Sequence, residues 1–92
     1  MTAARQMDVS GRVACVTGAS SGLGRRAALV LSHAGASVVA VARRAEALAS
    51  LEAEALGALY PLPFELSDRD RLENLAAQVA EPFGAPDILV HA

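Results

Sequence analysis

The chain has 92 residues and a hydrophobic content of 53%, which together suit one small globular domain and exclude a disordered chain. The formal net charge is −2 and the basic residues form no run, so the composition argues against nucleic acid as a partner. No apolar run approaches the ~20 residues that span a bilayer, and no apolar segment typical of a signal peptide follows the first six residues. These features predict a cytoplasmic protein that contacts neither a membrane nor nucleic acid.

The first half of the chain alternates between apolar runs and amphipathic segments. After a flexible arm over residues 1–8, the pattern predicts a strand over 12–17, a helix over 23–34 that ends at Gly35, and a strand over 37–42. The second of these strands is almost continuously apolar, which is typical of a strand buried on both faces of a parallel sheet.

The second half repeats this alternation. The pattern predicts a helix over 45–55, a strand over 59–66, a helix over 69–80 and a strand over 87–91. Prolines at 61 and 63 cannot donate to a β-ladder, so the third strand is expected at an edge of the sheet. We expect Ser67 and Asp68 to cap the third helix, and Pro82, Gly84 and Pro86 to interrupt the chain after it.

Strands that alternate with helices predict an α/β fold with a parallel sheet. Right-handed crossovers, with a reversal after the third strand, predict the strand order 3-2-1-4 of a Rossmann-like fold, the front part of a doubly wound three-layer sheet. The fourth strand contains an apolar run over 88–90 and would be an exposed edge. We therefore expect residues 9–92 to be the front segment of a longer protein.

A glycine-rich turn joins the first strand to the first helix. Its sequence is Thr-Gly-Ala-Ser-Ser-Gly-Leu-Gly, from Thr17 to Gly24. A helix N-terminus presents unpaired N–H groups and the positive end of the helix dipole, and glycines let a phosphate come close to them. Because a strand precedes this turn and a helix follows it, the motif predicts a nucleotide-phosphate site.

These residues resemble the short-chain dehydrogenase/reductase family, whose dinucleotide motif is Thr-Gly-x-x-x-Gly-x-Gly. The resemblance covers the chain from about Ser10 to Ala92. It implies an oxidoreductase that transfers hydride between a nicotinamide cofactor and a small carbonyl or alcohol substrate, and that forms a homo-oligomer when intact. The cofactor-binding residues that it implies in the turn are Gly18, Ser20, Ser21, Gly22, Leu23 and Gly24.

The end of the second strand predicts the choice of cofactor. An acidic residue at this place binds the ribose 2′-hydroxyl of NAD, whereas a nearby arginine favours the 2′-phosphate of NADP. Here Ala42 takes the acidic position, and Arg43 and Arg44 follow it. The pair favours NADP(H) over NAD(H), although two arginines could also simply begin a solvated helix.

The resemblance implies further cofactor contacts after the third and fourth strands. Glu65 and Leu66 stand where the family has an acidic residue and a backbone group beside the adenine, although Glu65 could equally be a polar strand end. His91 and Ala92 replace the start of the family's Asn-Asn-Ala-Gly segment, and their backbone could still line the adenosine side of the site.

The family catalyses with a serine and a Tyr-x-x-x-Lys pair. All eight basic residues of this chain are arginine, and Pro61 to Phe64 follow its single tyrosine, Tyr60. We therefore expect no catalytic residue in the chain, and read Tyr60 as structural. The isolated His33 and His91 predict no metal site, and Cys15 is expected to be a buried hydrophobe. The alternative hypothesis is a non-catalytic dinucleotide-binding or redox-sensing module; a purely structural scaffold would leave the glycine spacing unexplained.

Overall fold

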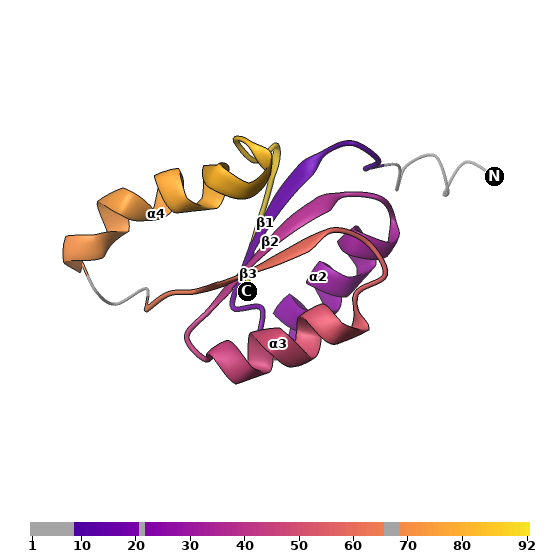
Figure 1. Cartoon of the computed structure of the whole chain (residues 1–92), viewed down its shortest axis with the longest axis horizontal. Coiled ribbons are helices and arrows are strands. Elements are labelled where there is room, and N and C mark those ends of the chain that lie inside the picture. The colour runs from indigo at the N-terminus through magenta and orange to yellow at the C-terminus, as the bar shows by residue number, and fades with distance from the viewer. Residues whose placement is uncertain (1–8, 21, 66–68) are drawn as a thin grey trace.

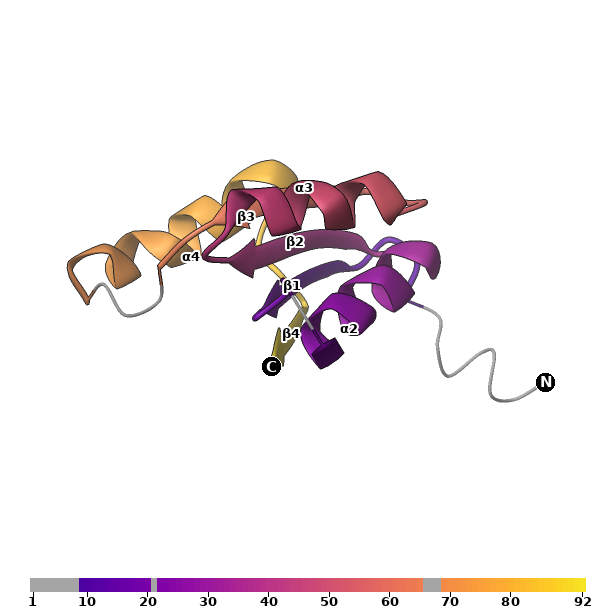
Figure 2. The same ribbon diagram turned by 90° about the horizontal axis from the view of Figure 1, so that it is seen from below.

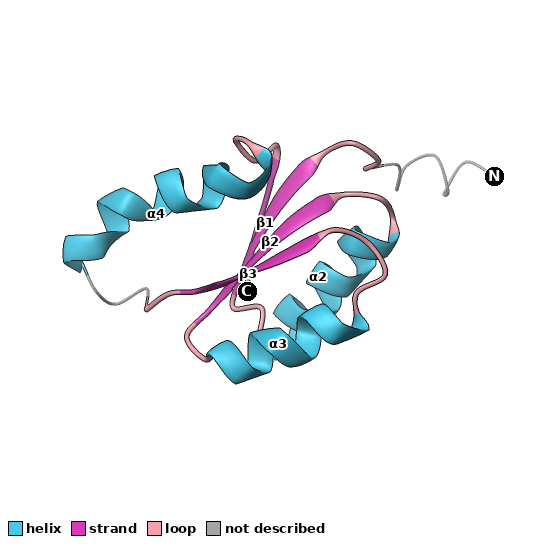
Figure 3. Cartoon of the chain, viewed as in Figure 1, coloured by secondary structure: helices cyan, strands magenta, loops and turns pink. Residues whose placement is uncertain are grey.

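A computed structural model describes residues 9–20, 22–65 and 69–92 (Figure 1). Strands and helices alternate along the described chain (Figure 3). In chain order they are β1 (Val13–Thr17), α2 (Gly22–His33), β2 (Ser37–Ala42), α3 (Ala45–Glu54), β3 (Leu59–Pro63), α4 (Arg69–Phe83) and β4 (Ile88–His91). The expected flexible arm over residues 1–8 lies outside the described residues.

The four strands form one parallel sheet in the order β3-β2-β1-β4, which Figure 2 shows from β3 to β4. The predicted order 3-2-1-4 is therefore confirmed. The register pairs Thr17 at the end of β1 with Val41 of β2 and with His91 of β4. Because all strands are parallel, their carboxyl ends lie along the same edge of the sheet, where open α/β folds bind ligands.

Helices cover both faces of this sheet, with α2 and α3 on one side and α4 on the other (Figure 1). The two strands at the centre are buried on both faces, as the apolar runs predicted. On one face, β1 and β2 pack against Leu48 and Leu51 of α3, which are both fully buried. Burial of each leucine contributes about 1.5–3 kcal/mol to folding. On the other face, Val79 of α4 packs with Cys15 and Phe64.

Helix α2 ends as the sequence predicted. Gly35 follows it with φ +101°, its N–H donates to the Ser32 carbonyl (3.2 Å), and the Ala36 N–H donates to the Leu31 carbonyl (3.0 Å). This pair of bonds is the Schellman arrangement, which satisfies the last carbonyls of a helix and favours glycine at the left-handed position.

Helix α4 corrects one prediction. The sequence pattern predicts that the helix stops at residue 80, before Pro82, but the helix continues to Phe83 and includes Pro82 in its last turn. The missing N–H of a proline costs one helical bond, and that loss is small where the helix is about to end. Gly84 ends it instead, with φ +94° and its N–H donating to the Ala80 carbonyl (2.8 Å).

Strand β3 is shorter than predicted and ends at Pro63 rather than at residue 66. Its partner β2 ends opposite Pro63, at Ala42, so the ladder has no further strand to follow. The Phe64 N–H still donates to the Ala42 carbonyl (2.8 Å). Backbone nitrogens point to alternate sides along a strand. Because the Phe64 nitrogen points toward β2, the nitrogens of Pro61 and Pro63 point to the outer edge, where their lack of an N–H costs no ladder bond.

Strand β4 forms the other edge of the sheet. Just before it, the Asp87 N–H donates to the Val13 carbonyl (2.7 Å), and the Val13 N–H donates to the Asp87 carboxylate (3.1 Å). The Leu89 side chain on this edge is 70% exposed. Among the described helices, none is long and apolar enough to cross a membrane.

Candidate cofactor site

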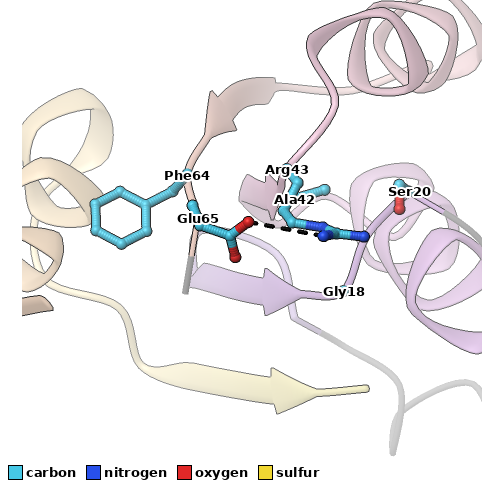
Figure 4. A pocket seen from close by; sticks show the side chains of 6 residues that line it. All are labelled: Gly18, Ser20, Ala42, Arg43, Phe64 and Glu65. Carbon is cyan, nitrogen blue, oxygen red and sulfur yellow. Dashed lines mark ion pairs between the residues drawn. The ribbon is translucent and has the colours of Figure 1, made fainter. Parts of the chain in front are cut away.

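The candidate site lies at the carboxyl ends of β1, β2 and β3. A cavity of about 240 Å³ opens there, bounded by residues that end these strands or follow them within three positions (Figure 4). Its lining residues are Gly18, Ser20, Ala42, Arg43, Phe64 and Glu65. Four of them are predicted site residues; Ala42 was predicted only as the missing acidic residue, and Phe64 was not predicted at all. Phe64 points away from Arg43 in Figure 4 and packs into the core on the α4 face.

Two glycines of the turn are required by packing within the protein. Gly18 has φ +67°, and a Cβ added to it would lie 2.5 Å from the Ala92 carbonyl oxygen. Gly24 is buried in α2, and an added Cβ would overlap the Gly18 carbonyl oxygen. The turn therefore folds back tightly between β1, the first turn of α2 and the residue after β4. Ala92 is held there by its N–H, which donates to the Thr17 carbonyl (3.3 Å).

The middle glycine of the motif, Gly22, differs from the other two. It begins α2 with φ +58°, yet an added Cβ would meet no atom of the described protein within 4 Å. The adjacent Leu23 is 81% exposed. Gly22 also lines a second hollow of about 270 Å³, with Arg25, Arg26 and Leu29. The first turn of α2 contains no acidic residue. Arg25 forms an ion pair with the Glu54 carboxylate, so the helix dipole and Arg26 are the groups that favour an anion here.

Arg43 brings a positive charge to the cavity from the end of β2. Its Nη1 lies 3.7 Å from the Glu65 Oε2, and the two side chains are 73% and 45% exposed. In Figure 4 the guanidinium points into the space between Glu65 and Ser20. Arg44 is exposed, takes the N-cap position of α3 and does not line the cavity.

The last residue of β4, His91, is bonded to β1. The Thr17 Oγ1 lies 2.7 Å from the His91 Nδ1 and donates to it when that nitrogen carries no proton; it also approaches the Val90 carbonyl at 3.5 Å. The bond was not predicted, although the register of β1 with β4 sets these residues opposite each other. His91 faces an apolar hollow of about 510 Å³ between β4 and α4, not the cavity beside Arg43.

Cys15 lines the same hollow and is buried, as predicted. Burial raises the pKa of the Cys15 thiol, because a thiolate would lose its hydration there. The predicted cofactor contacts at Ser21 and Leu66, and the predicted caps at Ser67 and Asp68, lie outside the described residues. Within the described part of the chain, no group of three or more His, Cys, Asp or Glu side chains could hold a metal ion.

A parallel sheet with the order 3-2-1-4, a glycine turn between the first strand and helix, and a cavity at the carboxyl ends of the strands define a dinucleotide-binding α/β protein. The family model described as short chain dehydrogenase matches residues 12–92. The chain belongs to this family, as the turn motif predicted.

Individual relatives agree with this assignment. The chain is 39% identical over 79 residues to a probable NADP-dependent dehydrogenase of Dichelobacter nodosus, covering 86% of this chain and 74% of the relative. A short-chain dehydrogenase/reductase of Mycobacterium marinum has a similar structure (TM-score 0.86, 32% identity), covering 97% of this chain and 37% of that one. A metagenomic short-chain oxidoreductase in complex with NADP is also similar (TM-score 0.80, 40% identity), covering 87% and 38%. The chain spans 36% or less of several other curated relatives.

Proposed function

We propose that this chain forms the NADP(H)-binding part of a short-chain oxidoreductase. The observation that carries the proposal is the position of Arg43, whose guanidinium lies at the cavity beyond β2 beside Ala42, where a carboxylate would select NAD. A guanidinium can bind a phosphate through two parallel, charge-assisted hydrogen bonds. A relative named as a probable NADP-dependent dehydrogenase and a structural neighbour in complex with NADP support the same cofactor.

The residues of the chain fit such a cofactor in three places. The open space beside Gly22, at the N-terminus of α2, suits the pyrophosphate, because a backbone without a Cβ can approach it. The cavity between Ser20 and Glu65 suits the adenosine ribose, with Arg43 facing its 2′-phosphate. Ala92 is held against the turn and would border the site from the β4 side.

For the whole protein, we propose hydride transfer between the nicotinamide and a small carbonyl or alcohol substrate. The bound cofactor supplies the hydride chemistry, and this chain binds and orients its adenosine and pyrophosphate groups. The catalytic residues are expected outside these 92 residues, because the chain contains no lysine for a Tyr-x-x-x-Lys pair. We also propose a cytoplasmic homo-oligomer.

Calorimetric titration of the full-length protein with NADP⁺ and NAD⁺ tests the cofactor. Replacing both Arg43 and Arg44 by alanine removes a charge-assisted contact of about 1.5–3 kcal/mol, which should raise the dissociation constant for NADP⁺ about 10- to 100-fold. The constant for NAD⁺ should change less than about three-fold, because NAD⁺ has no phosphate at that point.

Arg12→Ala is the matched control, since Arg12 is an exposed arginine at the opposite end of β1. Equal losses of NADP⁺ and NAD⁺ affinity in the double variant would contradict the proposal. The two arginines would then be an ordinary solvated start of α3.

A further inference from the structure

The ion pair between Arg43 and Glu65 lies across the proposed 2′-phosphate position. The two residues follow neighbouring strands, because β2 ends at Ala42 opposite Pro63 of β3. Their charged groups therefore meet at 3.7 Å, and both residues line the same cavity (Figure 4). A phosphate that binds Arg43 in this cavity must either share the guanidinium with the Glu65 carboxylate or displace that carboxylate from it.

The pair is weak enough to be displaced. Both side chains are substantially exposed. An exposed ion pair of this kind favours the paired over the separated side chains by no more than about five-fold. A phosphate offers a larger charge and a geometry that matches the guanidinium fork. The Glu65 carboxylate also repels any anion in the cavity. Both effects of Glu65 act against a 2′-phosphate and have little effect on an unphosphorylated ribose.

We propose that Glu65 is a specificity-determining residue that holds Arg43 before a nucleotide binds and limits the preference for a 2′-phosphorylated nucleotide. This inference rests on the proposed function, because it assumes that Arg43 meets the 2′-phosphate. It assigns to Glu65 an effect on the choice between the two cofactors, which is different from a contact with the adenine.

The test uses two small probes, adenosine 2′,5′-bisphosphate and 5′-AMP, which differ only in the 2′-phosphate. Their affinities for the full-length protein are measured by calorimetry. Glu65→Gln removes the charge but keeps the size and the hydrogen-bonding capacity of the side chain. It should tighten the bisphosphate about three- to ten-fold and change 5′-AMP by less than two-fold. Glu81→Gln is the matched control, because Glu81 is an exposed glutamate on α4.

The same change in an Arg43→Ala background shows whether the effect acts through the ion pair. There the gain should shrink to less than about two-fold, because no guanidinium remains for Glu65 to hold. A gain in affinity of equal size in both backgrounds would overturn the inference that Glu65 acts by holding Arg43, because repulsion of the phosphate by Glu65 would then explain the whole gain. Equal weakening of both probes, or no change, in Glu65→Gln would also overturn the inference. The proposed function fails separately, if the unmodified protein binds both probes equally and Arg43→Ala alters neither.

Discussion

The three glycines of the turn have different physical reasons to be glycine. Gly24 contacts the Gly18 carbonyl so closely that no Cβ fits, and Gly18 itself faces the Ala92 carbonyl. Gly22 has open space where a Cβ would lie, and the only requirement on this position is its left-handed backbone conformation. Gly22 is therefore the position where a side chain would affect a ligand more than it affects the fold.

This difference predicts opposite behaviour for two substitutions. Gly24→Ala should destabilise the fold by about 1–3 kcal/mol, because the new methyl group overlaps the backbone. Gly22→Asn should leave the stability nearly unchanged, because asparagine tolerates a positive φ, yet it should weaken NADP⁺ binding at least ten-fold. Thermal melts and NADP⁺ titrations of both full-length variants measure the two effects. Normal NADP⁺ affinity in a folded Gly22→Asn protein would contradict the assignment of this turn.

Part of the candidate site could be predicted from single residues. The spacing from Thr17 to Gly24 and the arginines after Ala42 are local signals, and local signals can be read along a chain. The pairing of Arg43 with Glu65 depends on the β2–β3 register and on side-chain directions, which no local pattern contains. For the same reason, the bond between Thr17 and His91 appears only when β1 and β4 are placed side by side.

At the scale of the elements, the four strands and three helices of the described chain could be predicted because each has a clear apolar period. The end of α2 could be predicted because glycine is typical of the position that Gly35 takes after a helix. The ends were less predictable where a tertiary contact decides them. Helix α4 passes Pro82 because its last turn needs few of its own bonds, and β3 stops at Pro63 because its partner strand stops. Proline lacks a backbone N–H donor, and the position of the proline in the fold determines whether that donor is needed.

Strand β4 carries a prediction for the 92 residues on their own. It is an edge with Leu89 70% exposed and an apolar hollow beside it, a combination that favours association. The isolated chain should therefore self-associate at about 100 µM, and Leu89→Lys should reduce the association, because charged residues protect sheet edges. Size-exclusion chromatography with light scattering measures both. A monomeric chain with a cooperative thermal melt at this concentration would contradict the prediction that the exposed β4 edge causes self-association.

At the scale of the whole molecule, the parallel sheet brings together groups that lie far apart in the sequence. The turn after β1, the arginine after β2 and the glutamate after β3 meet at one cavity because all three strands run in the same direction. The family's strand order places the reversal of the chain next to β1, where open α/β sheets bind their ligands. The position of the candidate site therefore follows from the direction of the strands and from where they end.

A crystal structure of the full-length protein with NADP⁺ tests the central claim most directly. The account predicts the pyrophosphate against the N-terminus of α2 beside Gly22, and the 2′-phosphate within hydrogen-bond distance of the Arg43 guanidinium, with Glu65 farther from Arg43 than the present 3.7 Å. A nucleotide bound away from the glycine turn, or a 2′-phosphate that does not contact Arg43, would contradict it.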